Sequence, residues 1–179
     1  MPTLPRAPAP TLAVETLAHG PFDLHSEASE RGTVILFYRG LHCPICAGQL
    51  KQAESQVDEF ARRGYGFIAI SGDGRDRAQA MAEKVEASRM RIGYGLDMTT
   101  ARAWGLYVSS GRGATSAGVE EPALFNEPGL FVVDRDGRTY YASVQSMPFA
   151  RPSLRELVSA LDFAIEKDYP ARGEVAEAA

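Results

Sequence analysis

The chain has two cysteines, Cys43 and Cys46, and only Pro44 and Ile45 separate them. Proteins of oxidising compartments usually carry several widely spaced cysteines that close long loops. A single C-x-x-C pair in a soluble chain instead indicates redox or metal chemistry. We therefore take Cys43 and Cys46 as the residues that carry the chemistry of this chain.

A thiol that exchanges disulfides must form a thiolate at neutral pH. Pro44 is typical of the first turn of a helix, where its missing N–H costs nothing. Cys43 is then at or next to the N-cap, where unsatisfied N–H groups and the positive end of the helix dipole favour a thiolate. His42, if protonated, would add to this effect, and no acidic residue within five positions opposes it.

The two cysteines have different expected roles. Residues three apart at a helix start lie on the same side, close enough to form a disulfide after small rotations. Cys46 belongs to the apolar stripe of the helix and is expected to be buried. Cys43 precedes the helix and is expected to be exposed. This asymmetry predicts that Cys43 attacks a substrate and that Cys46 resolves the mixed disulfide.

Two other interpretations of the pair remain open. The cysteines could be two core residues that fall three apart by chance. They could also belong to a metal-binding or metallochaperone module, although structural zinc takes four ligands and only His19, His25 and His42 could add to the two sulfurs. We interpret His19 and His25 as surface residues. Covalent haem attachment would need a histidine at position 47, which is alanine, and we expect no cofactor and no metal.

Hydrophobic patterns around the pair predict a β-α-β unit. Residues 33–38 form a continuous apolar run, typical of a strand buried on both faces. Apolar residues then recur at spacings of three and four over 44–63, which predicts an amphipathic helix. A second apolar strand is expected over 66–70, parallel to the first. The pair thus follows the C-terminal end of a central parallel strand, where open α/β sheets place their sites.

The remaining patterns complete an α/β domain. We expect a hairpin or lead-in strand over 11–24, helices over 76–87 and 98–104, a long Gly/Ser-rich loop over 107–128, strands over 130–133 and 138–144 joined by a turn, and a last helix that begins with a capping box at 153–156. The order β-α-β, helices, β-β-α is that of the thioredoxin fold, with a central mixed sheet flanked by helices. Residues 1–10 are expected to form a flexible arm, residues 11–167 a single domain, and residues 168–179 a loose tail.

Composition excludes several classes of function. The chain has 179 residues, 45% of them apolar and 23% charged, and a net charge of −4. Such a charge does not suggest nucleic-acid binding. No run of about 18 apolar residues could span a membrane, and the first ten residues lack the apolar region of a secretory signal. We therefore expect a cytoplasmic protein that contacts neither nucleic acid nor membrane.

Residues 36–46 (LFYRGLHCPIC) resemble the active-site segment of the alkyl hydroperoxide reductase/thiol-specific antioxidant group, which is peroxiredoxin-like. The resemblance spans roughly residues 12–167 and implies peroxiredoxin-like insertions in the thioredoxin fold. Less specific matches to the same group occur at 68–73 (IAISGD), 94–97 (YGLD), 104–107 (WGLY) and 130–134 (LFVVD).

The resemblance also aligns the peroxiredoxin motif P-x-x-x-T-x-x-C with this chain. Its cysteine falls on Cys46, its threonine on Cys43 and its proline on Arg39. The arginine that peroxiredoxins place before the third main strand falls on Pro128. Pro128 looks instead like the cis-proline that thioredoxins place beside their cysteine pair, so we expect a cis bond between Glu127 and Pro128.

Two mechanisms follow from these observations. In dithiol exchange, Cys43 attacks a disulfide. In the alternative, a thiol-dependent antioxidant peroxidase, Cys46 is oxidised by peroxide to a sulfenic acid and Cys43 condenses with it. Both mechanisms end at a Cys43–Cys46 disulfide, and Arg39 could stabilise a thiolate or polarise a peroxide. We predict exchange as the main function.

The expected partners are a thiol or dithiol electron donor and a disulfide or peroxide substrate. The sequence does not determine the oligomeric state, and a homodimer is compatible with it.

Overall fold

In the computed structural model, which describes residues 3–176, the apolar run after residue 31 forms strand β3 (Gly32–Phe37), and all six of its residues are buried. β3 pairs in parallel with β4 (Tyr65–Ile70), and helix α1 (Pro44–Arg62) connects the two strands. On its other side β3 pairs in antiparallel with β8 (Gly129–Asp134). The predicted β-α-β unit is therefore confirmed, at the centre of a mixed sheet.

The complete sheet has seven strands in the order β2-β1-β5-β4-β3-β8-β9. β1 (Ala13–Thr16) and β2 (Phe22–Asp23) form the predicted N-terminal hairpin. β8 and β9 (Thr139–Val144) form the predicted C-terminal hairpin, and the turn between them is closed by N–H groups that donate to the Asp134 carboxylate. The sequence did not predict β5 (Arg91–Tyr94), which pairs in parallel with β4.

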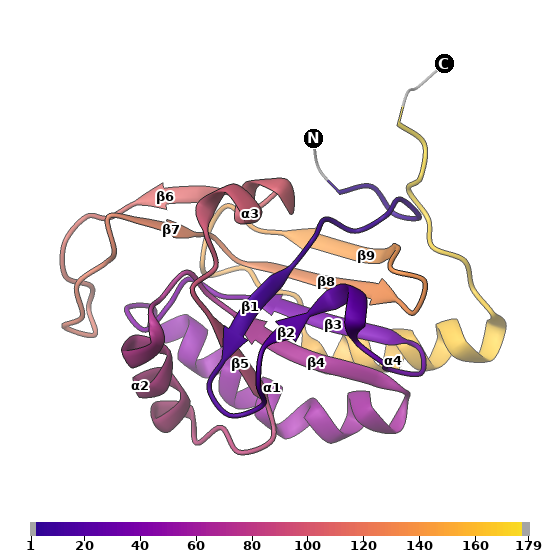
Figure 1. Ribbon diagram of the computed structural model, residues 1–179, viewed down its shortest axis with the longest axis horizontal. Coiled ribbons are helices and arrows are strands. Elements are labelled where there is room, and N and C mark those ends of the chain that lie inside the picture. Colours follow the sequence, from indigo (N-terminus) through magenta and orange to yellow (C-terminus); the bar gives the residue numbers. More distant parts are fainter. Residues whose placement is uncertain (1–2, 177–179) are drawn as a thin grey trace.

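Helices cover both faces of this sheet (Figure 1). α1, α2 (Arg75–Val85) and α4 (Leu154–Lys167) pack on one face, where Val34 and Leu36 of β3 join their core. α3 (Met98–Ala103) packs on the opposite face with Ile35, Phe37 and the buried Trp104. A short 3-10 helix, η1 (Leu24–Ser26), follows β2. The predicted ranges of α1, α2 and α3 agree with the structure to within two residues at each end, and α4 follows its predicted capping residue Ser153.

The loop expected over 107–128 contains a hairpin of its own. β6 (Val108–Ser110) pairs in antiparallel with β7 (Leu124–Asn126), and together they form a separate two-stranded sheet that projects from the main body (Figure 1). Each strand has only three residues, too few for a periodic pattern to predict.

The two ends of the domain are attached to the sheet. In the expected arm, the Arg6 N–H donates to Thr139 O at 2.7 Å, and the Ala9 N–H donates to Gly137 O at 2.9 Å. After α4, the Tyr140 hydroxyl donates to Tyr169 O at 2.8 Å. Residues 1–2 and 177–179 of the expected arm and tail lie outside the described residues, and the division into arm, domain and tail stays a prediction.

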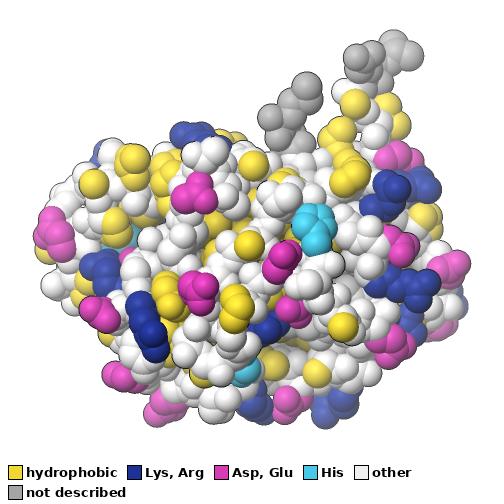
Figure 2. Space-filling view, viewed as in Figure 1, with side chains coloured by type: hydrophobic (Ala, Val, Ile, Leu, Met, Phe, Trp, Pro, Cys, Tyr) yellow, Lys and Arg dark blue, Asp and Glu magenta, His cyan; other side chains and the backbone are white. Residues whose placement is uncertain are grey.

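The surface shows no concentration of one charge on the face in view. Figure 2 shows basic, acidic and apolar side chains interspersed over it. Among residues 3–176, no helix is both long enough and apolar enough to cross a membrane.

Candidate active site

Cys43 is the N-cap of α1, as the sequence predicts. Its backbone is extended, with φ −102° and ψ 106°, and its Sγ accepts the Cys46 N–H at 3.3 Å. Pro44 is the first helical residue, where it leaves no backbone donor unsatisfied. The thiol of Cys43 therefore takes the place that a serine or aspartate oxygen takes in most caps.

A tight turn brings the chain from β3 to this cap. The Cys43 N–H donates to Gly40 O at 3.1 Å, and Gly40 has φ +133°, a conformation that L side chains rarely adopt. The fully buried Asp73 carboxylate supports the turn: it accepts the Leu41 N–H at 2.7 Å and the Arg77 Nε–H at 2.8 Å. A Cβ at position 40 would be 2.7 Å from Asp73 Oδ2, so the turn requires glycine.

Two N–H donors point at the sulfur of Cys46. The Arg39 backbone N–H lies 3.4 Å from Cys46 Sγ, and Arg151 Nη2 lies 3.3 Å from it. The same Arg151 nitrogen is 4.0 Å from Cys43 Sγ. Arg151 is held in place by the carbonyl of Pro148, at 2.7 Å, and by the side-chain oxygen of Gln49. One guanidinium thus lies beside both sulfurs.

Sequence reasoning missed Arg151. It lies 105 residues after Cys46, in the connection between β9 and α4, and neither periodicity nor spacing links the two positions. The resemblance placed the equivalent of the peroxiredoxin arginine at Pro128 instead. Only the antiparallel return of β8 and β9 brings the connection with Arg151 to the start of α1.

The prediction that Cys43 is exposed is wrong. Cys43 is 1% exposed and Cys46 0%, and both belong to the core cluster with Tyr38 and Leu154. The prediction considered only the helix end and not what covers it. The connection with Arg151 reaches the sulfurs, and the Thr115 hydroxyl of the β6–β7 loop donates to His42 O at 2.7 Å.

The two thiols have opposite acidities. A hydrogen bond from the Cys46 thiol lowers the pKa of Cys43 to about 6, the Cys46 N–H and Arg39 contribute to this, and burial opposes it. Burial raises the pKa of Cys46 well above its ordinary value, and the charge on Cys43 raises it further. The reduced pair therefore holds one negative charge on Cys43, while Cys46 keeps its proton.

His42 does not add positive charge to this pair. Its side chain is buried, and burial, followed by repulsion from Arg39, lowers its pKa. The ring packs 4.6 Å from the Phe125 ring, between centroids. The suggested contribution of a protonated His42 to the Cys43 thiolate is therefore not supported, because the β6–β7 hairpin covers this side of the turn.

Arg39 belongs to a buried ion-pair cluster. Its side chain is 14% exposed; Nε lies 3.2 Å from Glu127 Oε2 and Nη2 lies 3.5 Å from Glu121 Oε1. The guanidinium also lies 4.7 Å from the centroid of the Phe125 ring. Arg39 thus connects the cysteine pair to the β6–β7 hairpin.

The prediction of a cis bond before Pro128 is wrong, since no peptide bond within residues 3–176 is cis. The backbone at this point joins two sheets: the Glu127 N–H donates to Tyr107 O at 2.8 Å, and Pro128 O accepts the Gln145 N–H at 3.0 Å. These bonds require the extended chain that leads from β7 into β8.

The other histidines lie away from the pair. His19 and His25 are exposed, as predicted. Within the described part of the chain, no group of three or more His, Cys, Asp or Glu side chains could hold a metal ion.

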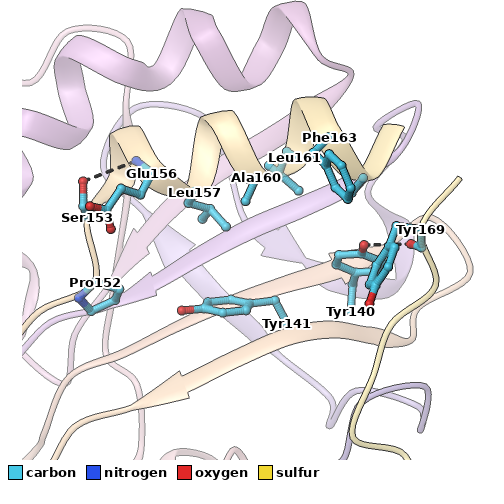
Figure 3. A pocket seen from close by; sticks show the side chains of 11 residues that line it. Tyr140, Tyr141, Pro152, Ser153, Glu156, Leu157, Ala160, Leu161, Phe163 and Tyr169 are labelled. Atoms are coloured by element: carbon cyan, nitrogen blue, oxygen red, sulfur yellow. Dashed lines mark hydrogen bonds between the residues drawn. The ribbon is translucent and has the colours of Figure 1, made fainter. Parts of the chain in front are cut away.

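An apolar groove of about 450 Å³ runs between α4 and β9 (Figure 3). Its lining is mostly aliphatic and aromatic and includes Tyr141, Leu157 and Ala160. Pro152, which follows Arg151 in the sequence, lies at one end of the groove (Figure 3). The groove contains neither cysteine, so the thiol chemistry takes place outside it.

Comparison with known proteins places the chain in a family. The model of the AhpC/TSA family matches residues 5–142, which is more than half of the chain. No curated protein sequence matches this chain.

Several solved structures share the fold at low sequence identity. Peroxidoxin BcpB from Mycobacterium tuberculosis is 20% identical, with a TM-score of 0.69 over 91% of this chain and 98% of its own. The mitochondrial 2-Cys peroxiredoxin from Plasmodium falciparum is 18% identical, with a TM-score of 0.71 over 97% of this chain and 100% of its own. A mutant of peroxiredoxin 6 from Arenicola marina is 15% identical, with a TM-score of 0.76 over 92% of this chain and 74% of its own.

These likenesses show the peroxiredoxin form of the thioredoxin fold, and the family match covers the cysteine pair with the strands on both sides of it. The chain therefore belongs to the AhpC/TSA family and is a peroxiredoxin-like oxidoreductase, either a thiol–disulfide oxidoreductase or a thiol peroxidase.

Proposed function

We propose that the protein is a thiol-dependent peroxidase in which peroxide oxidises Cys46 and Cys43 closes the disulfide. The observation that carries this proposal is the position of Cys46 Sγ between two N–H donors, Arg39 N and Arg151 Nη2. Such donors stabilise a thiolate and the negative charge that develops on a peroxide oxygen as its O–O bond breaks. Cys46 is also the position on which the family's peroxidatic cysteine falls.

The proposed cycle begins with a proton transfer. The Cys43 thiolate accepts the proton of Cys46 along the hydrogen bond between them, and this leaves a thiolate on Cys46. That thiolate attacks one peroxide oxygen, an S–O bond forms and the O–O bond breaks. The departing oxygen takes the proton back from Cys43 and leaves as an alcohol, or as water from hydrogen peroxide. Cys46 is then a sulfenic acid, and Cys43 is again a thiolate.

The second step closes the disulfide. The Cys43 thiolate attacks Cys46 Sγ, an S–S bond forms, and the S–O bond breaks with release of hydroxide, which takes a proton from solvent to give water. One thiolate, one thiol, one peroxide and one proton thus give the disulfide, an alcohol and water. Two equivalents of a thiol, or one dithiol, then return two electrons. A reducing compartment such as the cytoplasm suits this cycle, and a homodimer is compatible with it.

Single-cysteine variants test the assignment. Cys43→Ser places a hydroxyl where the family motif has threonine. Because the proton of Cys46 then passes to solvent and not to Cys43, we expect this variant to consume one equivalent of hydrogen peroxide more slowly than the wild type, and to leave a sulfenic acid on Cys46 that dimedone traps. Cys46→Ser is the matched control and should consume none on the same time scale. Rapid peroxide consumption by Cys46→Ser but not by Cys43→Ser would contradict the proposal.

A second function, dithiol exchange led by Cys43, is favoured by the pKa of Cys43, about 6. Against it, a sulfur that is 1% exposed is difficult for a disulfide on another protein to reach. This function predicts that Cys46→Ser traps a mixed disulfide through Cys43. Stable mixed disulfides with a protein substrate, without peroxide consumption by the wild type, would establish exchange instead.

A further inference from the structure

A polar hollow of about 370 Å³ lies between Arg39 and the β6–β7 hairpin. Arg39 forms one wall, and the hairpin supplies most of the rest, including Ser109, Arg112, Glu121 and Glu127. This volume is within the range of pockets that hold small molecules. Unlike the groove between α4 and β9, the hollow is lined by charges of both signs.

Three of the charged groups of the hollow, Arg39, Glu121 and Glu127, have side chains that are almost completely buried. The side chains of Glu121 and Glu127 are 10% and 6% exposed. The Ser109 hydroxyl donates to Glu127 Oε1 at 2.7 Å, and the Arg112 N–H donates to Glu121 Oε2 at 2.8 Å. These bonds fix the two carboxylates beside Arg39, and the exposed side chain of Arg112 completes the charged lining.

Two of these groups retain hydrogen-bonding capacity. Arg39 Nε and Glu127 Oε2 are 3.2 Å apart, but their relative orientation does not allow a hydrogen bond between them. Neither of these two atoms has another hydrogen-bond partner among the described residues. Buried polar groups in native proteins are nearly always bonded, and an exception calls for an explanation. An ion pair with this unused capacity, which a ligand reaches only after the two side chains turn toward the hollow, suits a molecule with an anionic and a cationic group.

The hollow communicates with the sulfurs through Arg39. The Arg39 guanidinium stabilises the Cys43 thiolate, and its backbone N–H donates to Cys46 Sγ. A molecule paired with this guanidinium is therefore separated from Cys43 by a single side chain. Because the two sulfurs are at most 1% exposed, a small molecule suits this position better than a protein surface.

We propose that the hollow binds the electron donor, and that this donor is a small amino-acid thiol with a free ammonium and a free carboxylate. The carboxylate pairs with Arg39 and Arg112, and the ammonium pairs with Glu127 and Glu121. This inference rests on the proposed cycle, since the donor reduces the disulfide which that cycle forms.

The reduction takes two exchange steps. A donor thiolate attacks Cys43 Sγ, the S–S bond to Cys46 breaks, and Cys46 leaves as a thiolate that the Arg39 N–H and Arg151 stabilise before it takes up a proton. A second donor thiolate then attacks the donor sulfur of the mixed disulfide. The products are a donor disulfide and the Cys43 thiolate, so two donor thiols have supplied two electrons.

Four thiols separate the contributions of the two charges. Cysteine carries both groups, N-acetylcysteine only the carboxylate, cysteamine only the ammonium, and mercaptoethanol neither. The protein is first oxidised with diamide, so that the assay does not depend on peroxide chemistry. Rates of disulfide reduction are measured at a range of thiol concentrations, and each is divided by the thiolate concentration and by the rate with a small linear disulfide.

We expect cysteine to saturate and to exceed each single-charge thiol by a factor of about ten, the effect of one hydrogen bond between charged groups. Arg112→Ala should lower the cysteine rate to that of cysteamine, and Glu127→Gln should lower it to that of N-acetylcysteine. Arg135→Ala, at an exposed arginine outside the hollow, is the control and should leave the order unchanged.

Rates that follow thiolate concentration alone, without saturation, would overturn the donor proposal. An unchanged preference in both Arg112→Ala and Glu127→Gln would do the same. Neither result would affect the peroxidase proposal, which fails separately if peroxide does not close the disulfide. Failure of diamide to close it would contradict both.

Discussion

Two arginines, one before Cys46 in the sequence and one after it, donate to the sulfur of Cys46. Arg39 offers its backbone N–H and Arg151 its guanidinium, at 3.4 Å and 3.3 Å. In the alignment with the family motif, this chain lacks the motif's proline and threonine. The position of the family's arginine is occupied by Pro128. Arg151, in the connection between β9 and α4, thus places a cation beside Cys46 although the aligned position of the family's arginine is Pro128.

Arg151→Ala is expected to slow peroxide reduction about 100-fold, the loss typical when one preorganised donor is removed from an active site. Arg151→Lys keeps the charge but not the paired geometry with Gln49, and should retain an intermediate rate. The measurement is the single-turnover rate of hydrogen peroxide consumption. Arg155→Ala, at an exposed position of α4, is the matched control, and an equal loss there would refute a specific role for Arg151.

The acidity of Cys43 determines the pH dependence. Because its pKa is about 6, the pair carries its negative charge above that pH and loses it below. The rate of peroxide reduction should therefore fall as the pH is lowered through about 6 and level off above it. Ultraviolet absorbance of the thiolate should titrate over the same range.

The same titration tests the cause of the shift. The Cys46 thiol is the largest contributor to the low pKa of Cys43, so Cys46→Ala should move the midpoint of the thiolate absorbance toward the ordinary value for cysteine. A midpoint that stays near 6 in Cys46→Ala would show that the helix cap and Arg39 suffice.

At the scale of elements, the turn between β3 and α1 positions both sulfurs. Gly40→Ala should destabilise the fold by ~2 kcal/mol, since it forces a residue with a Cβ into a glycine conformation and against Asp73. Gly48→Ala is the control: no atom lies within 4 Å of its added Cβ, and alanine should stabilise α1 by roughly 0.5–1 kcal/mol. Urea unfolding measures both, and equal effects of the two substitutions would contradict this account of the turn.

Elements with long patterns were predictable from the sequence. β3 is a six-residue strand in which every residue is buried, and α1 and α4 are amphipathic helices of 19 and 14 residues, each with a capping residue at its start. β5, β6 and β7 were not predicted. They have four, three and three residues, and their strand character depends on partners distant in sequence or across a loop.

The site was predictable only in its local part. The C-x-x-C spacing identified Cys43 and Cys46, and Pro44 identified the helix start. The contact of Arg151 and the burial of Cys43 depend on segments that return from more than 70 residues away, and no local pattern carries that information.

At the scale of the molecule, one buried carboxylate ties α1 to the chain that enters β5. Glu54 accepts the N–H groups of Ser88, Arg89 and Met90, the first two at Oε1 and the last at Oε2. Although burial raises its pKa, these bonds outweigh burial and lower it from 4.5 to about 2. A shift of that size corresponds to roughly 3 kcal/mol.

The sign of this effect is definite. Because the folded-state pKa is depressed, the stabilisation is complete above about 4.5 and is lost as the pH falls toward 2. Glu54→Gln should therefore lower the free energy of unfolding at pH 7 and flatten its dependence on pH between these values. Glu30→Gln, at a largely exposed carboxylate, is the control. An unchanged pH dependence in Glu54→Gln would exclude this role.

The most direct test of the central claim is a single turnover of the reduced protein with one equivalent of hydrogen peroxide, followed by intact-mass and peptide analysis. The account predicts that the peroxide is consumed, that the wild type loses two hydrogen atoms, and that the new bond joins Cys43 to Cys46. It also predicts that Cys43→Ser, treated in the same way, carries one added oxygen on Cys46. Peroxide that remains unconsumed while the same protein reduces a disulfide substrate would contradict the account.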